Sequence, residues 1–208
     1  MIVQEKNTET VIFEAAKDVF TEKGFDGARM QEIAEKASIN KALLHYYYRT
    51  KEKLFNAIFE RVFGDFIPKV TGMFETDAPL VDKIKFFVEH YIDFILKNPH
   101  IPSFIIHELN RHPQRVVDLI GNKTGLIKNN AFGKFAESVR QEIEKENIIP
   151  IEPEQLIVNV IGLCIFPFVA KPILMGVIFK NDKKKYHEFL ESRKQEVAKF
   201  VIQAIKKK

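Results

Sequence analysis

The sequence predicts an all-α protein of about nine helices, on three observations. Apolar residues recur at three- and four-residue spacing along most of the 208-residue chain, which is the periodicity of helices packed on a core. Sustained alternation of apolar and polar residues, which marks half-buried strands, is nearly absent. The composition, 46% hydrophobic and 29% charged, is that of an ordinary globular protein and argues against disorder.

The first fifty residues divide into short helical segments with recognisable ends. Apolar residues repeat at helical spacing over residues 11–20, and Gly24 can end that helix in a left-handed conformation. A short element over residues 30–37 follows, and the next turn ends at Asn40, which can cap another helix. Thr50 can cap a further helix in the same way. Residues 30–48 therefore form a candidate helix-turn-helix unit, whose second helix would lie in the major groove of DNA.

Longer helices are expected in the rest of the chain. Their apolar positions and flanking prolines predict helices over residues 81–95, 103–109, about 126–146, 153–179 and about 182–206. Pro153 suits the first turn of its helix, where no backbone N–H is needed.

The stretch GFDGARMQEIAEKASINKALLHYYYRTKEKLF, residues 24–55, resembles the DNA-binding domain of the TetR/AcrR family of bacterial transcription regulators. The features that carry the resemblance are Gly24-Phe25, Ile33-Ala34, the turn Ile39-Asn40-Lys41, Leu44, Tyr47-Tyr48 and Lys51-Glu52 with Leu54. They keep one consistent spacing over roughly residues 8–63. The resemblance implies a helix-turn-helix DNA-binding domain over residues 1–53 and an effector-binding and dimerisation domain over residues 54–208. It also implies a ligand-responsive repressor that binds a palindromic operator.

The chain departs from the family pattern at three places. Ser38 stands where family members usually have glycine, which suits a left-handed turn. Ala28 and Arg29 stand where a threonine or serine often caps the second helix and contacts phosphate, and Arg29 can contact phosphate itself. His45 replaces a common tyrosine.

The unbroken row of rings HYYY predicts an aromatic face toward DNA. Successive helical residues point about 100° apart, so the three tyrosines cannot share one buried stripe. The core stripe is either Leu43, Leu44 and Tyr47, or Leu44 and Tyr48, and the family pattern favours the second. Under both alternatives Tyr46 points outward.

Contacts with DNA can be assigned from residue type and position. Lys41 and Ala42 open the recognition helix and can reach bases, whereas His45 and Tyr47 can donate to phosphate oxygens. By the resemblance, Lys51 contacts phosphate. Residues 29–53 hold six basic and three acidic residues, a local net charge of +3 within a chain of net charge +4. The predicted DNA-binding residues are Arg29, Gln31, Asn40, Lys41, Ala42, Leu43, His45, Tyr46, Tyr47 and Lys51.

A two-fold homodimer is expected because one helix-turn-helix reads only one half-site. The most apolar helix, Leu156–Phe179, is the best candidate for the dimer face, with the last helix beside it. The family resemblance implies the same four-helix interface, and the alternative is that these apolar residues form a monomer core.

The middle helices are expected to hold a pocket for a small apolar or aromatic effector. The residues that would line it also fit an ordinary core, and they are Phe104, His107, Phe132, Asn159 and Phe166.

No pattern in the sequence predicts an enzyme, a cofactor or a metal site. The segment HELNRH places His107 and His112 five residues apart and about 140° apart on a helix, whereas zinc-binding helices need spacing i, i+4. No glycine-rich phosphate loop and no nucleophile elbow occur. Two rival hypotheses are an all-helical small-molecule or lipid carrier without DNA binding and, more distantly, a metal-dependent hydrolase.

A cytoplasmic location is expected. The single cysteine, Cys164, excludes an internal disulfide and fits a reducing compartment, and the start MIVQEKNTET lacks the pattern of a signal peptide. The segment Leu156–Phe179 has the length of a membrane span, but an asparagine, a lysine and two prolines interrupt it. We therefore expect it to be buried between subunits rather than in a membrane.

Overall fold

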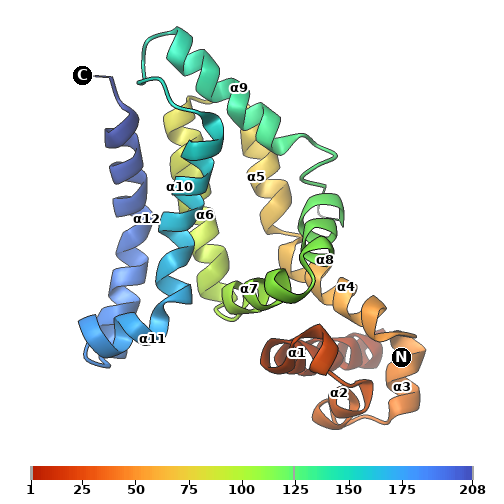
Figure 1. The fold of residues 1–208 in the computed structure, drawn as a ribbon. Helices are drawn as coiled ribbons and strands as arrows, with labels where there is room; N and C mark the ends of the chain where they lie inside the picture. Colours follow the sequence, from red (N-terminus) through yellow and green to blue (C-terminus); the bar gives the residue numbers. More distant parts are fainter. Residues whose placement is uncertain (1, 124, 208) are drawn as a thin grey trace. The chain divides into compact units, whose positions relative to one another are not determined.

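The computed structural model describes residues 2–123 and 125–207, and within them the chain is all-α (Figure 1). No strand occurs in these two ranges, where one isolated bridge pairs Ile148 with Lys206. The predicted fold class is confirmed. In chain order the α-helices and two π-helical segments are α1 (Ile2–Gly27), α2 (Met30–Lys36), α3 (Lys41–Tyr47), α4 (Lys51–Phe63), α5 (Phe66–Glu75), α6 (Leu80–Lys97), α7 (Ile101–Arg111), α8 (Pro113–Val117), η1 (Asp118–Lys123), α9 (Ala131–Glu144), α10 (Pro153–Val169), α11 (Lys171–Ile173), η2 (Leu174–Ile178) and α12 (Lys183–Ile205).

These segments outnumber the nine expected because breaks divide some of the predicted helices. The helix that starts after Thr50 is interrupted at Gly64 and resumes as α5. α8 and η1 occupy a region where only a loose connection was expected, and α8 begins with Pro113. The long apolar helix ends at Val169. Pro172 lies just downstream and cannot donate the backbone N–H that would continue the helix.

Contacts between Cα atoms divide the chain into two compact units. The first consists of Met1–Asp65 with Ser103–Thr124, and the second of Phe66–Pro102 with Gly125–Lys208. The first unit therefore contains α1 to α4, most of α7, α8 and η1. The functional boundary expected between residues 53 and 54 is a different division, and it stays a prediction.

Local signals in the sequence account for the ends of the short helices in the first unit. Asn40 accepts a hydrogen bond from the Leu43 N–H at 2.7 Å, and Thr50 accepts one from the Lys53 N–H at 3.1 Å. Both predicted caps are confirmed. Ser38, which replaces the usual glycine, has φ of 55°, in the left-handed region that glycine would favour.

The core of the first unit joins all four of its first helices. The side chains that are buried there are Ile12, Ala16, Val19 and Phe20 of α1, Ile33 and Ala34 of α2, Leu44 of α3, and Leu54, Phe55 and Ile58 of α4. Their burial holds α2 and α3 against α1 and α4, because each short helix contributes too few apolar residues to be stable alone.

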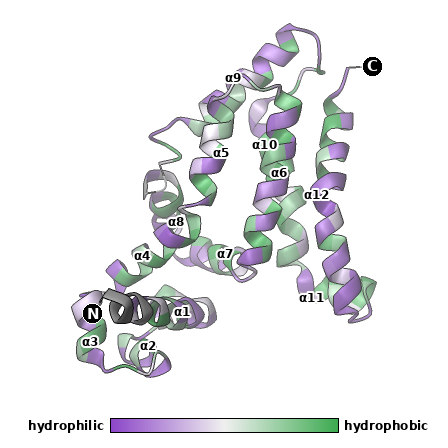
Figure 2. Ribbon diagram, turned by 180° about the vertical axis from the view of Figure 1, so that it is seen from behind, coloured by the Kyte–Doolittle hydropathy of each residue, from purple (hydrophilic) through white to green (hydrophobic). Residues whose placement is uncertain are grey.

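α6 is the central helix of the second unit. It contacts α5, α9, α10 and α12, and Figure 1 shows α6, α10 and α12 side by side. Apolar residues of α6 recur at helical spacing and are buried, namely Ile84, Val88, Ile92 and Ile95. In Figure 2, hydrophilic and hydrophobic residues alternate along α12, which buries Leu190, Val197 and Val201.

A proline inside α10 determines how α12 binds it. Pro167 has no N–H, so the carbonyl of Leu163, four residues earlier, lacks its partner within the helix. The Arg193 guanidinium of α12 donates to that carbonyl at 2.6 Å, and the Tyr186 hydroxyl donates to the carbonyl of Pro167 at 2.8 Å. Burial raises the pKa of Tyr186, which keeps this hydroxyl a donor.

The apolar segment that was compared with a membrane span is bent. Among the described residues, no single helix has both the length and the composition needed to cross a bilayer. α10 and residues 171–178 meet that criterion only as a pair, and they are bent by 58° at the break between them.

Replacing Arg193 with methionine should destabilise the protein, because the partly buried carbonyl of Leu163 would lose its donor. We expect the free energy of unfolding in urea to fall by about 1–3 kcal/mol. Lys199→Met, at an exposed position of the same helix, should change it by less than about 0.5 kcal/mol. Equal effects of the two substitutions would show that the Arg193 hydrogen bond contributes nothing.

Candidate DNA-binding surface

The predicted recognition helix, α3, has one fully buried residue and three exposed ones. Leu44 is fully buried, whereas Lys41 and Ala42 at its start are exposed. Tyr46 is 76% exposed, so the prediction that it points outward is confirmed. Tyr47 is half-buried and meets the Tyr46 ring edge-on, with 5.5 Å between ring centroids. The end of α3 thus carries two adjoining tyrosine rings, and its start carries an exposed lysine.

The buried stripe of α3 combines the two alternatives. Leu43, Tyr47 and Tyr48 are each half-buried around Leu44, so neither proposed stripe is buried to the exclusion of the other. Tyr48 follows the last helical residue in an extended conformation, and burial raises the pKa of its hydroxyl.

Two further predicted residues are tied to the protein next to this face. His45 Nδ1 lies 3.2 Å from the Arg49 carbonyl oxygen, a distance at which Nδ1–H donates and leaves Nε2 free for another partner. Gln31 is exposed on α2 and its amide donates to Glu35 at 2.8 Å. Arg29 precedes α2 without a capping hydrogen bond from its side chain.

Several basic residues of the unit have no ion-pair partner. Lys36 and Lys23, by contrast, form ion pairs with α1 and α2, because Lys36 lies 3.0 Å from Asp18 and Lys23 lies 2.5 Å from Glu32. The remaining charge lies where α2 begins, on α3 and where α4 begins. The exposed basic residues there that form no ion pair with any described residue are Arg29, Lys41, Arg49 and Lys53.

Lys51 holds the loop between α1 and α2. Its ammonium donates to the carbonyls of Asp26 at 3.2 Å and Ala28 at 3.0 Å, and it lies 4.5 Å from the centroid of the Phe25 ring. Two of its three N–H groups are therefore used inside the protein, and one remains for a phosphate.

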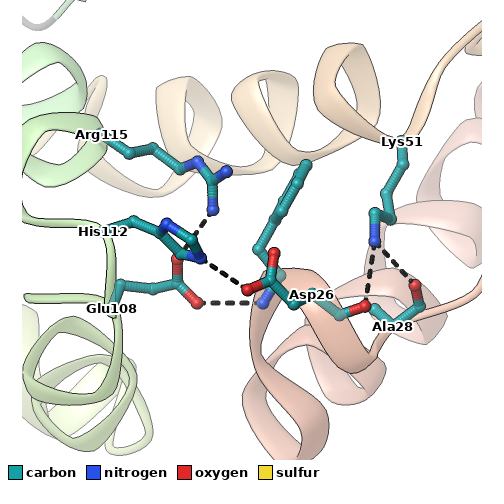
Figure 3. Close-up of polar contacts among 7 residues, drawn as sticks. Asp26, Ala28, Lys51, Glu108, His112 and Arg115 are labelled. Carbon is teal, nitrogen blue, oxygen red and sulfur yellow. Dashed lines mark hydrogen bonds and ion pairs between the residues drawn. The ribbon is translucent and has the colours of Figure 1, made fainter. Parts of the chain in front are cut away.

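A cluster of charged residues from the middle of the chain, drawn in Figure 3, fixes the same loop. The backbone N–H of Phe25 donates to Glu108 of α7 at 2.9 Å, and Arg115 donates to the other oxygen of Glu108 at 3.2 Å. The Arg115 guanidinium also lies 3.9 Å from the centroid of the Phe25 ring. Glu108 is only 1% exposed, so its charge depends on these two donors. We call Phe25, Glu108 and Arg115 the Glu108 clamp.

A second pair lies beside the clamp. His112 Nε2 and Asp26 Oδ2 are 2.5 Å apart (Figure 3). The hydrogen bond from His112 is the main reason that the pKa of the Asp26 carboxyl lies below its ordinary value.

The backbone at Gly24 makes both contacts possible. Its φ of 68° ends the regular part of α1, as predicted, and directs the next N–H toward Glu108. A Cβ at this position would also lie 2.8 Å from Nε2 of His107. Glycine is therefore required here by both conformation and space.

The segment HELNRH has a structural role that the sequence did not predict. Glu108 and His112 bind the loop at Phe25 and Asp26, 83 and 86 residues earlier in the chain. Reasoning from the sequence missed these residues and Arg115. The one available signal was a glutamate between Ile106 and Leu109 in a helix with several apolar residues.

The five residues predicted for the effector pocket are divided between the two units. Phe104 is buried in the first unit with its ring 5.5 Å from that of Phe55, and His107 is exposed there. Phe132, Asn159 and Phe166 belong to the second unit and are exposed on α9 and α10. Their role in effector binding stays a prediction.

Among the described residues, those that could bind a metal ion or act as a nucleophile are not arranged for either role. In the described part of the chain, no three His, Cys, Asp or Glu side chains are grouped so that they could hold a metal ion. Cys164 is fully buried, and burial raises the pKa of its thiol to about 12, so it is not a nucleophile at neutral pH.

The first unit is all-α, and α3, the second helix of its helix-turn-helix, exposes aromatic residues. Basic residues around it form no ion pair with any described residue. These features define the class of helix-turn-helix DNA-binding proteins. Comparison with known proteins identifies the family. Residues 12–58 match the family described as "Bacterial regulatory proteins, tetR family". The transcriptional repressor NicS of Pseudomonas putida is 36% identical over 148 residues, covering 65% of this chain and 69% of NicS. The chain belongs to the tetR family, whose members are DNA-binding regulators of transcription and not enzymes.

Other similar proteins extend beyond the helix-turn-helix. The regulator RutR of Escherichia coli K12 is 27% identical over 147 residues, covering 70% of this chain and 66% of RutR, slightly less than two thirds of its length. The crystal structure of HlyIIR, a hemolysin II transcriptional regulator, matches 98% of this chain and 99% of its own with a TM-score of 0.65. At 20% identity, that match shows a shared fold.

Gly24→Ala should destabilise the protein, because alanine resists the left-handed backbone and its Cβ would meet His107. The free energy of unfolding should fall by at least about 1–2 kcal/mol. Gly72→Ala is the matched control, since its Cβ would enter open space on α5 and should stabilise the helix by about 0.5–1 kcal/mol. Unchanged stability of Gly24→Ala would contradict the requirement for glycine.

The Asp26–His112 pair should make stability depend on acid pH. Asp26 has an ordinary pKa of 3.8 and a lower one in the folded protein, so acid protonates it first in the unfolded state. The stabilisation is complete above pH 3.8 and is lost as pH falls through the lower folded pKa. Urea unfolding should therefore show a difference between the wild type and Asp26→Asn that shrinks as pH falls below 3.8. A difference that grows in acid would contradict this sign.

Proposed function

We propose that this chain is a ligand-responsive repressor that binds a palindromic DNA operator as a homodimer and is released from it by a small molecule. The observation that carries the proposal is the exposed surface of α3, where Tyr46 points outward on the same side as Ala42 and Lys41 is exposed at the start of the helix. A tyrosine exposed to 76% on a helix with a buried leucine opposite has no role in the core of its own unit. Aromatic and basic side chains on a recognition helix suit contact with bases and phosphates.

Phosphate binding is proposed for the unpaired basic residues around α3. Arg29, Lys41, Arg49 and Lys53 are exposed, and they would flank a helix placed in the major groove. His45 and Tyr47 can add donors from their half-buried positions, and Asn40 and Leu43 lie at the start of the same helix. Lys51 and Gln31 complete the predicted surface, although each already makes a hydrogen bond within the protein.

Dimerisation is proposed through α10, α12 and the segment between them. Large apolar side chains are exposed there, namely Val158, Phe166, Ile173, Val177, Ile178 and Phe200. So many exposed apolar groups on neighbouring helices favour a protein interface over a free surface. A two-fold interface of this kind would carry two recognition helices to two half-sites.

Regulation by a small apolar or aromatic effector is the third part of the proposal. It rests on the family and on the predicted lining residues Phe104, His107, Phe132, Asn159 and Phe166. An effector acts by binding one shape of the dimer better than another, so it would favour a shape with wrongly spaced recognition helices. Repression is proposed rather than activation because the similar protein NicS is named a transcriptional repressor.

Tyr46→Ala and Lys41→Ala should each reduce operator affinity by at least about tenfold while leaving the unfolding curve unchanged, because both side chains are exposed. Fluorescence anisotropy with a labelled operator measures the loss. Lys97→Ala, which removes an exposed lysine from α6, is the control for the change in net charge. Wild-type affinity in both α3 variants would exclude α3 as the DNA-reading helix.

Lys51→Ala should weaken binding to specific and unrelated duplexes by the same factor and lower the salt dependence by about one phosphate contact. It should also cost about 1 kcal/mol of stability, because the Asp26 and Ala28 carbonyls lose a donor. A loss confined to the operator, with the salt dependence intact, would show that Lys51 only positions the loop.

Selection of bound duplexes from a random DNA pool by the purified protein tests the proposal as a whole. We expect an enriched palindrome whose half-sites lie about one helical turn apart. A folded, dimeric protein freed of bound ligand that enriches no sequence would instead support the rival hypothesis, an all-helical carrier without DNA binding.

A further inference from the structure

The second unit contains an open polar cavity of about 1110 Å³ between the end of α5, the start of α6 and α9. Its lining combines lysines, carboxylates and amides, including Asp77, Lys83, Lys134, Ser138 and Asn147. None of the residues predicted for the effector pocket lines it. The cavity is therefore a separate place in which a small molecule could bind.

Lys83 is the unusual residue of this cavity. Lys83 lies on α6 and is only 4% exposed. Lysine is almost never fully buried in proteins unless it is paired. The ammonium donates to the Ser138 hydroxyl at 2.8 Å and to the Phe74 carbonyl at 3.3 Å. Both acceptors are neutral, so two of the three N–H groups are satisfied while the positive charge is not compensated.

A structural role alone does not explain why this group is charged. Phe74 is one of the last residues of α5, so Lys83 supplies a donor to a carbonyl that the helix end leaves free. A neutral hydroxyl or amide could make both hydrogen bonds without the cost of burying a charge. Burial lowers the pKa of Lys83, and the negative charge of Asp77 opposes that effect.

The other carboxylates of the cavity are already bound to partners. Glu75 pairs with Lys134 at 2.5 Å, and Glu142 pairs with Lys145 at 3.3 Å and also accepts from Asn147 at 2.8 Å. Glu137 lies 3.8 Å from Arg140. These pairs keep the acidic groups from neutralising Lys83.

Asp77 is the exception. It is exposed, it lines the cavity, and it forms no ion pair with any residue in the described ranges. Its charge reaches Lys83 only through space, since the two groups are not within ion-pairing distance. The cavity thus offers one buried positive charge and one exposed negative charge, and neither group forms an ion pair within the described ranges.

We propose that this cavity binds a small zwitterion of the free amino acid class, with the carboxylate at Lys83 and the ammonium toward Asp77. A carboxylate would occupy the third N–H of Lys83 and neutralise its charge. An ammonium group would find the carboxylate of Asp77, the one carboxylate of the cavity that forms no ion pair with a described residue. A bound carboxylate would also raise the pKa of Lys83.

The test is thermal unfolding of the full-length protein with single free L-amino acids, acetate and methylammonium as probes. At about five times its dissociation constant, a binding amino acid should raise the unfolding midpoint by about 2–4 °C. Acetate and methylammonium at the same concentration should raise it far less, since each satisfies only one end. No shift with any amino acid, or an equal shift with acetate, would overturn the proposal.

Three variants locate the binding. Lys83→Met should abolish the shift, and Asp77→Asn should weaken amino acid affinity at least about tenfold. Lys145→Met, which removes a paired lysine from the same cavity, should bind within about twofold of the wild type. Binding retained by Lys83→Met would overturn the proposal.

A second measurement covers the case in which Lys83→Met does not fold. In the wild-type protein, the amino acid should shift the amide NMR signals of Asp77, Gly133 and Ser138 around the cavity. Shifts confined to α10 and α12 would place the ligand elsewhere and overturn the assignment. Because each measurement is made without DNA, failure of the repressor proposal would leave these results unaffected.

Discussion

The arrangement of the first unit depends on one hydrogen bond, from the backbone N–H of Phe25 to the buried carboxylate of Glu108. The left-handed backbone at Gly24 turns that N–H away from its helix, and an N–H without a partner in a buried position is costly. Glu108 satisfies it and is in turn neutralised by Arg115, which also lies over the Phe25 ring. The loop from α1 to α2, and with it the start of the helix-turn-helix, therefore has a position that the first 65 residues alone do not determine.

The positive charges of the same unit are divided between two uses. Lys36, Lys23 and Lys51 are bound to carboxylates, carbonyls or a ring inside the unit, and they hold helices and loops in place. Arg49 and Lys53 stay exposed and form no ion pair with any described residue. A net charge of +3 counted over residues 29–53 hides this division, because it counts Lys36 as available when α1 already neutralises it.

The sequence predicted those features whose physical cause is local. The caps at Asn40 and Thr50 are hydrogen bonds across three residues, and the break at Gly24 follows from a conformation that glycine adopts easily. The outward direction of Tyr46 follows from helical geometry alone. Contacts between distant residues could not be predicted in the same way, because nothing near Glu108 indicates that its partner is Phe25. The two neutral hydrogen-bond acceptors of Lys83 could not be predicted either, since they depend on α5, α6 and α9 coming together.

The first unit is discontinuous, since it joins Met1–Asp65 to Ser103–Thr124 across nearly forty residues of the other unit. A DNA-binding unit built from Met1–Asp65 alone would leave the Phe25 N–H and the Asp26 carboxylate without the partners that residues 108 and 112 supply. Exchange of DNA specificity between relatives, whether by recombination or in an engineered chimera, would then have to transfer two separate stretches of gene or preserve Glu108, His112 and Arg115 in the recipient. The first unit would therefore have to be transferred as a pair of segments rather than as a single domain at one end of the chain.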